Sequence, residues 1–502
     1  MRSRFFAPAL WCALALLCAA AVQPALAAED TRLVDAVRAN DRTAALALLA
    51  RRAAVNVNGP EVDGTTALHW AVHHGDVDLV GRLLRAGAKV NVANQYGATP
   101  LSEAATVGSV PLLDALLKAG ADVRALNSEG ESALMLVART GNIDAARLLI
   151  ARGADVNASE KWRGQSALMW AVAEGQAAMV VELIRQGADV NARSAVNAWE
   201  RDVTAEPRRK YMPRGGFTPL LYAAREGCLA CAAALIEAGA DVNFQDPDLV
   251  PPLSAAIVNG QYDVAALLVE RGADVNRTDR WGRTPLWSMV DMHTPPRSQR
   301  PDVFEADAAG GDALLRLLLA RGADVNAQLV LFPPYRSLAD RGSDNLLTIG
   351  ATPLIRAAKA GDAAAMTLLL ERGAAVDALT ADGITPLLAA AGVASRDSDS
   401  RGRFKTEQEA IEAVGLLLAA GANINAVDNR GVTAVHGAAF WGFNELVQFL
   451  ADRGARLDAK DRRGMTPIDS AMGRAGGNGF GGNRIDVHAD TAALIENLLR
   501  RP

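Results

Sequence analysis

Residues 63–91 read DGTTALHWAVHHGDVDLVGRLLRAGAKVN, and this stretch contains the signals that decide the fold. Thr66 can cap the helix formed by the apolar run after it, and Gly75 is expected to end that helix in the left-handed conformation. Apolar residues then recur at helical spacing, at Leu79, Val80, Leu83 and Leu84. Gly87 follows them, so the stretch predicts two short helices joined by a tight turn.

The closing Gly-Ala string recurs along the whole chain. Its glycines are Gly87, Gly120, Gly153, Gly187, Gly239, Gly272, Gly322, Gly373, Gly421 and Gly454. The intervals between them are 33, 33, 34, 52, 33, 50, 51, 48 and 33 residues. Five intervals fit a unit of about 33 residues, and the other four are that unit plus 15 to 19 residues. Each helix pair exposes apolar surface on two sides, so stacked neighbours are needed to bury it.

These units resemble ankyrin repeats, of the exported bacterial kind. The resemblance rests on DGTTALHWAV at 63–72 and RGVTAVHGAA at 430–439, each followed by a Gly-Ala-x-x-Asn/Asp close. It covers residues 30–500 and implies an all-α ankyrin-repeat solenoid of about twelve helix-turn-helix units, with β-hairpin-like turns and several long insertions. The first unit, 30–56, and the last, 460–502, lack the regular close, which suits solvent-facing caps. The family's usual role is protein–protein recognition, although a fold alone does not settle a function.

Five insertions are expected, near 193–213, 291–311, 328–349, 392–408 and 473–487. The first and third lie between units, and the second and fourth interrupt a unit between its helices. Aromatic and charged residues occur at 198–201 and 208–211 in the first and at 331–335 in the third. Long loops on a rigid scaffold are often functional. Contact with a partner and packing over the solenoid are both open for these loops.

The N-terminus has the pattern of a signal peptide. Arg2 and Arg4 precede an apolar run from Phe5 to Val22, and Ala25-Leu26-Ala27 offers small residues at the positions that a signal peptidase reads. Cleavage would leave a continuous solenoid, 28–502, in the periplasm or secreted. An uncleaved membrane anchor is the alternative, because the run is near the length that spans a bilayer.

Charge excludes one class of partner. The chain has 52 basic and 57 acidic residues, and loss of residues 1–27, with two arginines and no acid, changes the net charge from −5 to −7. The basic residues form no stripe that could hold a phosphate backbone, so no nucleic-acid partner is expected. The mature protein is expected to be monomeric, without a membrane contact and without a cofactor.

No motif indicates an enzyme or a metal centre. No Gly-x-Ser-x-Gly, phosphate-binding glycine loop or His-Glu-x-x-His occurs. His69 and His73 are four residues apart, as in a metal pair, but no spacing fixes a third ligand. His69 and His436 instead match a structural histidine of the repeat. Trp70, Trp170 and Tyr222 replace an apolar residue of the first helix, which predicts core positions.

Cys228 and Cys231 are the two cysteines that remain after cleavage. Their Cys-x-x-Cys spacing at the start of a second helix favours a structural disulfide in an oxidising compartment. Packed free thiols and a redox-active pair are the alternatives.

In such a stack, the turn tips and the exposed sides of the first helices would line a concave groove where a partner could bind. The turn-tip candidates are Tyr96, Trp162 and Trp281. The first-helix candidates are His73, Arg139, Glu174, Arg225, Lys359 and Trp441. Trp162 and Trp281 could alternatively cover the neighbouring turn.

The leading hypothesis is therefore an exported scaffold that binds a protein partner. Its rivals are a secreted effector that acts on host proteins and a redox protein that uses the cysteine pair.

Overall fold

The computed structural model describes residues 30–51, 55–198, 214–293, 308–331, 348–394, 405–474 and 487–501. The described chain forms twelve helix pairs and contains no strand. Isolated antiparallel bridges join Leu126 to Ser132, Ser159 to Ser166 and Val196 to Gly215 in the turns. The predicted all-α solenoid of about twelve helix-turn-helix units is confirmed.

The first helix of most pairs begins at the second residue of a Thr-Pro-Leu or similar string. These helices are α1 (Arg32–Arg38), α3 (Ala67–His73), α5 (Pro100–Val107), α7 (Ala133–Thr140), α9 (Ala167–Ala173), α11 (Pro219–Glu226), α13 (Pro252–Val258), α15 (Pro285–His293), α17 (Pro353–Ala360), α19 (Pro386–Ala390), α21 (Ala434–Phe440) and α23 (Pro467–Ala471). The second helices are α2 (Arg42–Ala50), α4 (Val77–Arg85), α6 (Val110–Lys118), α8 (Ile143–Ala151), α10 (Ala177–Arg185), α12 (Leu229–Glu237), α14 (Tyr262–Glu270), α16 (Ala308–Ala320), α18 (Ala363–Glu371), α20 (Glu407–Ala419), α22 (Asn444–Ala451) and α24 (Ala489–Leu499).

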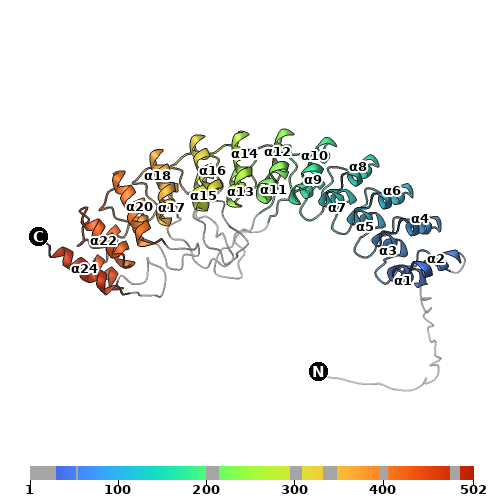
Figure 1. Ribbon diagram of the computed structural model, residues 1–502, viewed down its shortest axis with the longest axis horizontal. Coiled ribbons are helices and arrows are strands. Elements are labelled where there is room, and N and C mark those ends of the chain that lie inside the picture. Colours follow the sequence, from blue (N-terminus) through green and yellow to red (C-terminus); the bar gives the residue numbers. More distant parts are fainter. Residues whose placement is uncertain are drawn as a thin grey trace, which may run out of the picture. The chain divides into compact units, whose positions relative to one another are not determined.

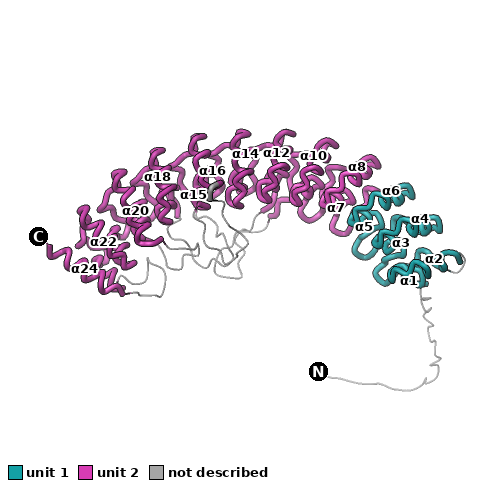
Figure 2. Tube along the Cα trace, viewed as in Figure 1, with its two compact units in different colours: residues 1–122 teal, residues 123–502 magenta. Residues whose placement is uncertain are grey.

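Two compact units divide the chain after Asp122 (Figure 2). Unit 1 contains α1 to α6, and unit 2 contains α7 to α24. Within unit 2 the pairs stand side by side in chain order (Figure 1), and each first helix packs on the next, as α11 does on α13. The leucine after the opening Thr-Pro or its equivalent is buried in most pairs, as at Leu134, Leu168 and Leu220. Each such burial contributes about 1.5–3 kcal/mol.

Repeat ends are built from local signals. Thr218 caps α11 by accepting a hydrogen bond from the backbone N–H of Leu221, and Gly227 ends that helix with φ +80°. His69 accepts the backbone N–H of Thr66 through Nδ1, so its Nε2 carries the proton that it donates to the carbonyl of Ala98. Burial lowers the pKa of His69. Both nitrogens of this histidine therefore hold the turn in place.

Neighbouring repeats are tied by an asparagine ladder. Each member donates through Nδ2 to the carbonyl of the next closing glycine, and its Oδ1 accepts the backbone N–H two residues beyond that glycine. The members are Asn58, Asn91, Asn157, Asn191, Asn243, Asn276, Asn326 and Asn425. Asn191 reaches Gly239 at 3.2 Å across one predicted insertion, and Asn157 reaches Gly187 at 3.1 Å without one. Stacking is therefore the same with or without an insertion.

The predicted signal peptide, 1–27, lies outside the described residues. So do the central parts of the five predicted insertions, including residues 199–211 and 332–335. In the described ranges, no helix is long and apolar enough to cross a membrane.

Candidate partner-binding surface

A pocket of about 520 Å³ opens on the first-helix side of three consecutive repeats in unit 2. Helix α7 contributes Arg139, α9 contributes Trp170 and Ala173, and α11 contributes Tyr222 and Arg225. Trp170 and Ala173 are three residues apart, as are Tyr222 and Arg225, so both residues of each helix lie on one side of it. The other lining residues are Glu129, Glu131, Glu160, Trp162, Arg163, Gln165 and Glu174. Four of the nine predicted partner-binding residues, Arg139, Trp162, Glu174 and Arg225, thus come together.

The turn that carries Trp162 explains why this tryptophan projects. Its glycine, Gly164, lies four residues after Glu160, whereas Gly130 in the preceding turn lies three after Asn127. The 34-residue interval records this extra residue. Glu160 spans the longer turn, because its buried carboxylate accepts the backbone N–H groups of Trp162 at 2.6 Å, Arg163 at 2.7 Å and Gln165 at 3.1 Å. Trp162 is left 64% exposed.

Cations stack on the aromatic rings of the pocket. The guanidinium carbon of Arg139 lies 5.4 Å from the centroid of Trp170, and that of Arg225 lies 5.1 Å from the centroid of Tyr222. The hydroxyl of Tyr222 accepts a hydrogen bond of 2.6 Å from Nε2 of Gln165. Such cation–π pairs contribute about 0.5–2 kcal/mol and hold long side chains in defined positions. The pocket is therefore a preformed surface that combines apolar rings with charges of both signs.

Trp70 and Trp170, both half-buried, correct the prediction that they are core positions. Tyr222 is buried, as a core position should be, but Trp170 is only half-buried, and both line the pocket. Sequence reasoning missed them because an aromatic residue at a first-helix apolar position fits a core equally well. The sequence offered one signal for a surface role. In α7 and α11 an arginine, Arg139 or Arg225, stands three residues after the helix position that Trp170 and Tyr222 occupy.

Three other candidates are not free to meet a partner. Trp281 is 7% exposed, and Val330 of the next turn donates its backbone N–H to the Trp281 carbonyl. Lys359 is 9% exposed, because Lys405 lies across the end of α17 and donates to the Lys359 carbonyl at 3.0 Å. Trp441 is half-buried and donates through Nε1 to the carbonyl of Gly392 at 3.0 Å.

The remaining two candidates lie in unit 1. Tyr96 is a turn-tip residue with 63% of its surface exposed. His73, also exposed, contacts Glu103 through Nδ1 at 2.6 Å. They are therefore not part of the pocket in unit 2.

Helices α15 and α17 differ from the pocket helices because they carry buried ionic groups. Asp291 and Arg356 form a buried ion pair of 2.6 Å. His293 lies between Asp362, 2.6 Å from Nδ1, and Asp312, 2.8 Å from Nε2. The hydrogen bond to Asp362 is the main cause that raises the pKa of His293 to about 9. These charges are used to join helices.

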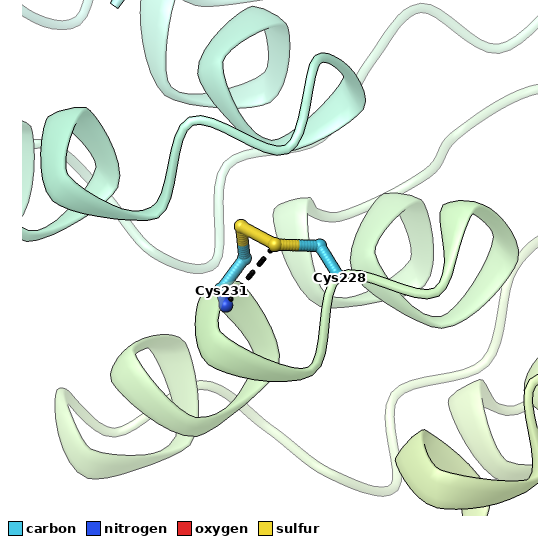
Figure 3. Close-up of a disulfide and its surroundings, with 2 residues drawn as sticks. All are labelled: Cys228 and Cys231. Atoms are coloured by element: carbon cyan, nitrogen blue, oxygen red, sulfur yellow. Dashed lines mark hydrogen bonds between the residues drawn. A yellow bond between two sulfur atoms is a disulfide. The ribbon is translucent and has the colours of Figure 1, made fainter.

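Cys228 and Cys231 are joined by a disulfide in the structure (Figure 3). Cys228 is the N-cap of α12, and its sulfur accepts the backbone N–H of Cys231 at 3.2 Å. Cys231 is fully buried. In the described residues, no group of three or more His, Cys, Asp or Glu side chains is arranged to hold a metal ion.

Comparison with known families and structures gives consistent matches. The family description "Ankyrin repeats (3 copies)" matches residues 33–127, 102–194, 202–287 and 405–477, and the single "Ankyrin repeat" matches 349–381. These ranges cover more than half of the chain. The crystal structure of the human ASB11 ankyrin repeat domain is 24% identical over 48% of this chain and 98% of that one, with a TM-score of 0.40.

Proposed function

Because the chain belongs to the ankyrin-repeat family, whose repeats generally mediate protein–protein binding, we propose that it is an exported scaffold that holds a protein partner in the pocket of unit 2. The observation that carries the proposal is the exposed Trp162 beside the stacked pairs Arg139–Trp170 and Arg225–Tyr222. Trp, Tyr and Arg most often carry interface energy, because they bury large areas or make several directed bonds. The proposed binding site is therefore this one pocket, and not the whole concave groove expected from the sequence.

Export rests on residues 1–27, with their basic start, apolar run and Ala25-Leu26-Ala27 site. The proposed location is the periplasm or the medium of a bacterium. Cell fractionation distinguishes the two, and protein in the medium would favour the effector alternative.

Position-specific cross-linking tests the binding site. A photo-reactive amino acid at position 162 should cross-link a protein partner in cells, and one at position 181 should not. Val181 is an apolar residue of the same repeat with 44% exposure, and it lies on the second helix, α10, outside the pocket lining. Equal labelling from both positions, or none from position 162, would contradict the proposal.

Substitutions in the pocket measure its contribution to the free energy of partner binding. Trp162→Ala with Arg225→Ala should weaken capture of the cross-linked partner by about 1–4 kcal/mol. Val181→Ala should leave capture unchanged.

A further inference from the structure

Trp70 and Trp170 occupy the same position of the first helix in two repeats, but their indole N–H groups differ. Trp70 donates through Nε1 to the carboxylate of Glu61 at 3.0 Å. The turn before Trp170 is one residue longer, so the residue that corresponds to Glu61 is Glu160, whose carboxylate accepts backbone N–H groups of its own turn. Among the described residues, the buried Nε1 of Trp170 has no hydrogen-bond acceptor. The carboxylate therefore satisfies the indole N–H in one repeat, whereas in the other the corresponding carboxylate is engaged by the backbone of the turn.

An unsatisfied buried N–H group costs about 1–3 kcal/mol, so its persistence needs an explanation. The explanation here lies among its neighbours. The guanidinium of Arg139, stacked on the Trp170 ring, has no carboxylate partner among the described residues. The indole N–H of Trp170 and the guanidinium of Arg139 are thus two donor groups at the pocket for which the described residues supply no carboxylate acceptor.

The carboxylates around the pocket do not fill this role. Glu160 is engaged by three backbone N–H groups, Glu131 accepts from Asn127 at 2.7 Å, and Glu226 pairs with Arg225. Glu129 and Glu174 are exposed at the pocket and would repel a run of acidic residues. The charges therefore fit one carboxylate in an otherwise uncharged segment.

We infer that the pocket binds an aspartate or glutamate side chain of the partner, whose carboxylate accepts from Trp170 Nε1 and from the Arg139 guanidinium. This inference rests on the proposed function and adds the chemistry of the group that is recognised. A charge-assisted bidentate contact of this kind has a defined geometry. The exposed ring of Trp162 and the ring of Tyr222 would contact the apolar residues on either side of the carboxylate.

The test uses the mature full chain labelled with ¹⁵N at its tryptophan indoles. The probes are three acetylated, amidated pentapeptides, Ala-Leu-Glu-Leu-Ala and its versions with Gln or Lys in the centre. The Trp170 resonance, assigned with Trp170→Phe, should shift with the Glu peptide. The Gln peptide should bind about tenfold more weakly, as expected for loss of a charged hydrogen bond. The Trp70 resonance is the internal control and should stay in place.

Two substitutions separate recognition from folding. Arg139→Gln should weaken the Glu peptide about tenfold while the thermal unfolding midpoint stays within a degree or two. Trp170→Phe removes the indole N–H and keeps an aromatic ring, so it should also weaken binding of the Glu peptide.

Equal binding of the Glu and Gln peptides, preference for the Lys peptide, or no shift of Trp170 would overturn the inference. So would an Arg139→Gln variant that binds the Glu peptide as the parent chain does. If position 162 still cross-links a partner in these cases, the binding function stands and only the carboxylate is wrong. If cross-linking from position 162 also fails, the proposed function itself is wrong.

Discussion

Trp162 and Trp281 stand at corresponding places in their turns, yet one is exposed and the other is buried. Their turns differ in length by one residue, since Glu160 lies four residues before its glycine and Asp279 lies three before its own. In the shorter turn Arg283 stacks on Trp281 at 5.0 Å. Turn length alone does not decide exposure, because Tyr96 stands in a turn of the shorter form and is 63% exposed.

Stability measurements should separate the two tryptophans. Trp281→Ala removes a buried ring and should lower the free energy of unfolding by about 3 kcal/mol. Trp162→Ala should change it by less than about 0.5 kcal/mol, as for a surface substitution. Urea titration followed by circular dichroism measures both. Similar losses in the two variants would contradict the assignment.

His293 should make stability depend on alkaline pH. Its pKa is about 9 in the folded chain, above the ordinary value of 6.5, so protonation favours the fold. This stabilisation is complete below pH 6.5 and is lost as the pH rises through 9. The loss is at most about 3 kcal/mol, because each pKa unit corresponds to about 1.4 kcal/mol. Urea unfolding at pH 6.5, 8 and 9.5 checks it, and His293→Gln should flatten the profile over this range.

At the scale of elements, the ladder explains why Asn recurs in the Gly-Ala-Asp-Val-Asn string. Its amide supplies both a donor and an acceptor, which the backbone of the next repeat needs. Two places break the pattern. Arg124 donates through Nε to Gly153 at 3.2 Å, and Asp377, which has no donor, only accepts the backbone N–H of Asn423 at 3.5 Å.

Asp377→Asn should therefore stabilise the chain. The new amide can donate to the carbonyl of Gly421, as Asn425 does to Gly454, and a gain of about 1 kcal/mol is expected for one such bond. Asn276→Ala, which removes two ladder bonds, should lose about 1–3 kcal/mol. The urea midpoint is the measurement. A destabilised Asp377→Asn chain would show that the carboxylate has another role.

The cysteine pair is also an element-scale feature, because it joins the cap and first turn of α12. In protein taken from an oxidising periplasm, mass spectrometry after thiol alkylation should find Cys228 and Cys231 unlabelled. Reduction should change stability only modestly, since so small a loop restrains little chain entropy. Two labelled cysteines before reduction would favour the free-thiol alternative.

The sequence predicts the elements well and the surface less well. Repeat strings such as GADVN act locally, so helix pairs and their number follow from them. Burial of Lys359 depends on Lys405, 46 residues away, and the Asp291–Arg356 pair joins residues 65 apart. No repeat position encodes such contacts. The extra residue at Trp162 was visible as the 34-residue interval, but its effect on exposure needed the path of the turn.

At the scale of the whole molecule, the first-helix face changes character within unit 2. The positions equivalent to Trp170 and Tyr222 are the buried Ala255, Ser288 and Arg356 in α13, α15 and α17. The aromatic and charged residues that line the pocket are thus concentrated in α7 to α11 and their turns, next to the described ends of the first predicted insertion, where Ala195 donates its backbone N–H to the carbonyl of Arg163.

The mature chain should begin at Ala28. N-terminal sequencing of the native protein decides this, because signal peptidase reads the small residues that precede the cut. A chain that begins at Met1 and needs detergent for extraction would instead be anchored in the membrane.

The asparagine ladder has the same hydrogen bonds with and without an insertion. This has a consequence for how such a chain can change during evolution. A ladder step that spans 48 residues, as from Asn191 to Gly239, closes a longer loop than one of 29 residues, as from Asn58 to Gly87. The added entropy of closure is only about 0.4 kcal/mol, because it grows with the logarithm of loop length. One ladder hydrogen bond, at about 1 kcal/mol, exceeds that. New segments can therefore be acquired at the turns over evolutionary time, one at a time, while the stack beneath them keeps its spacing.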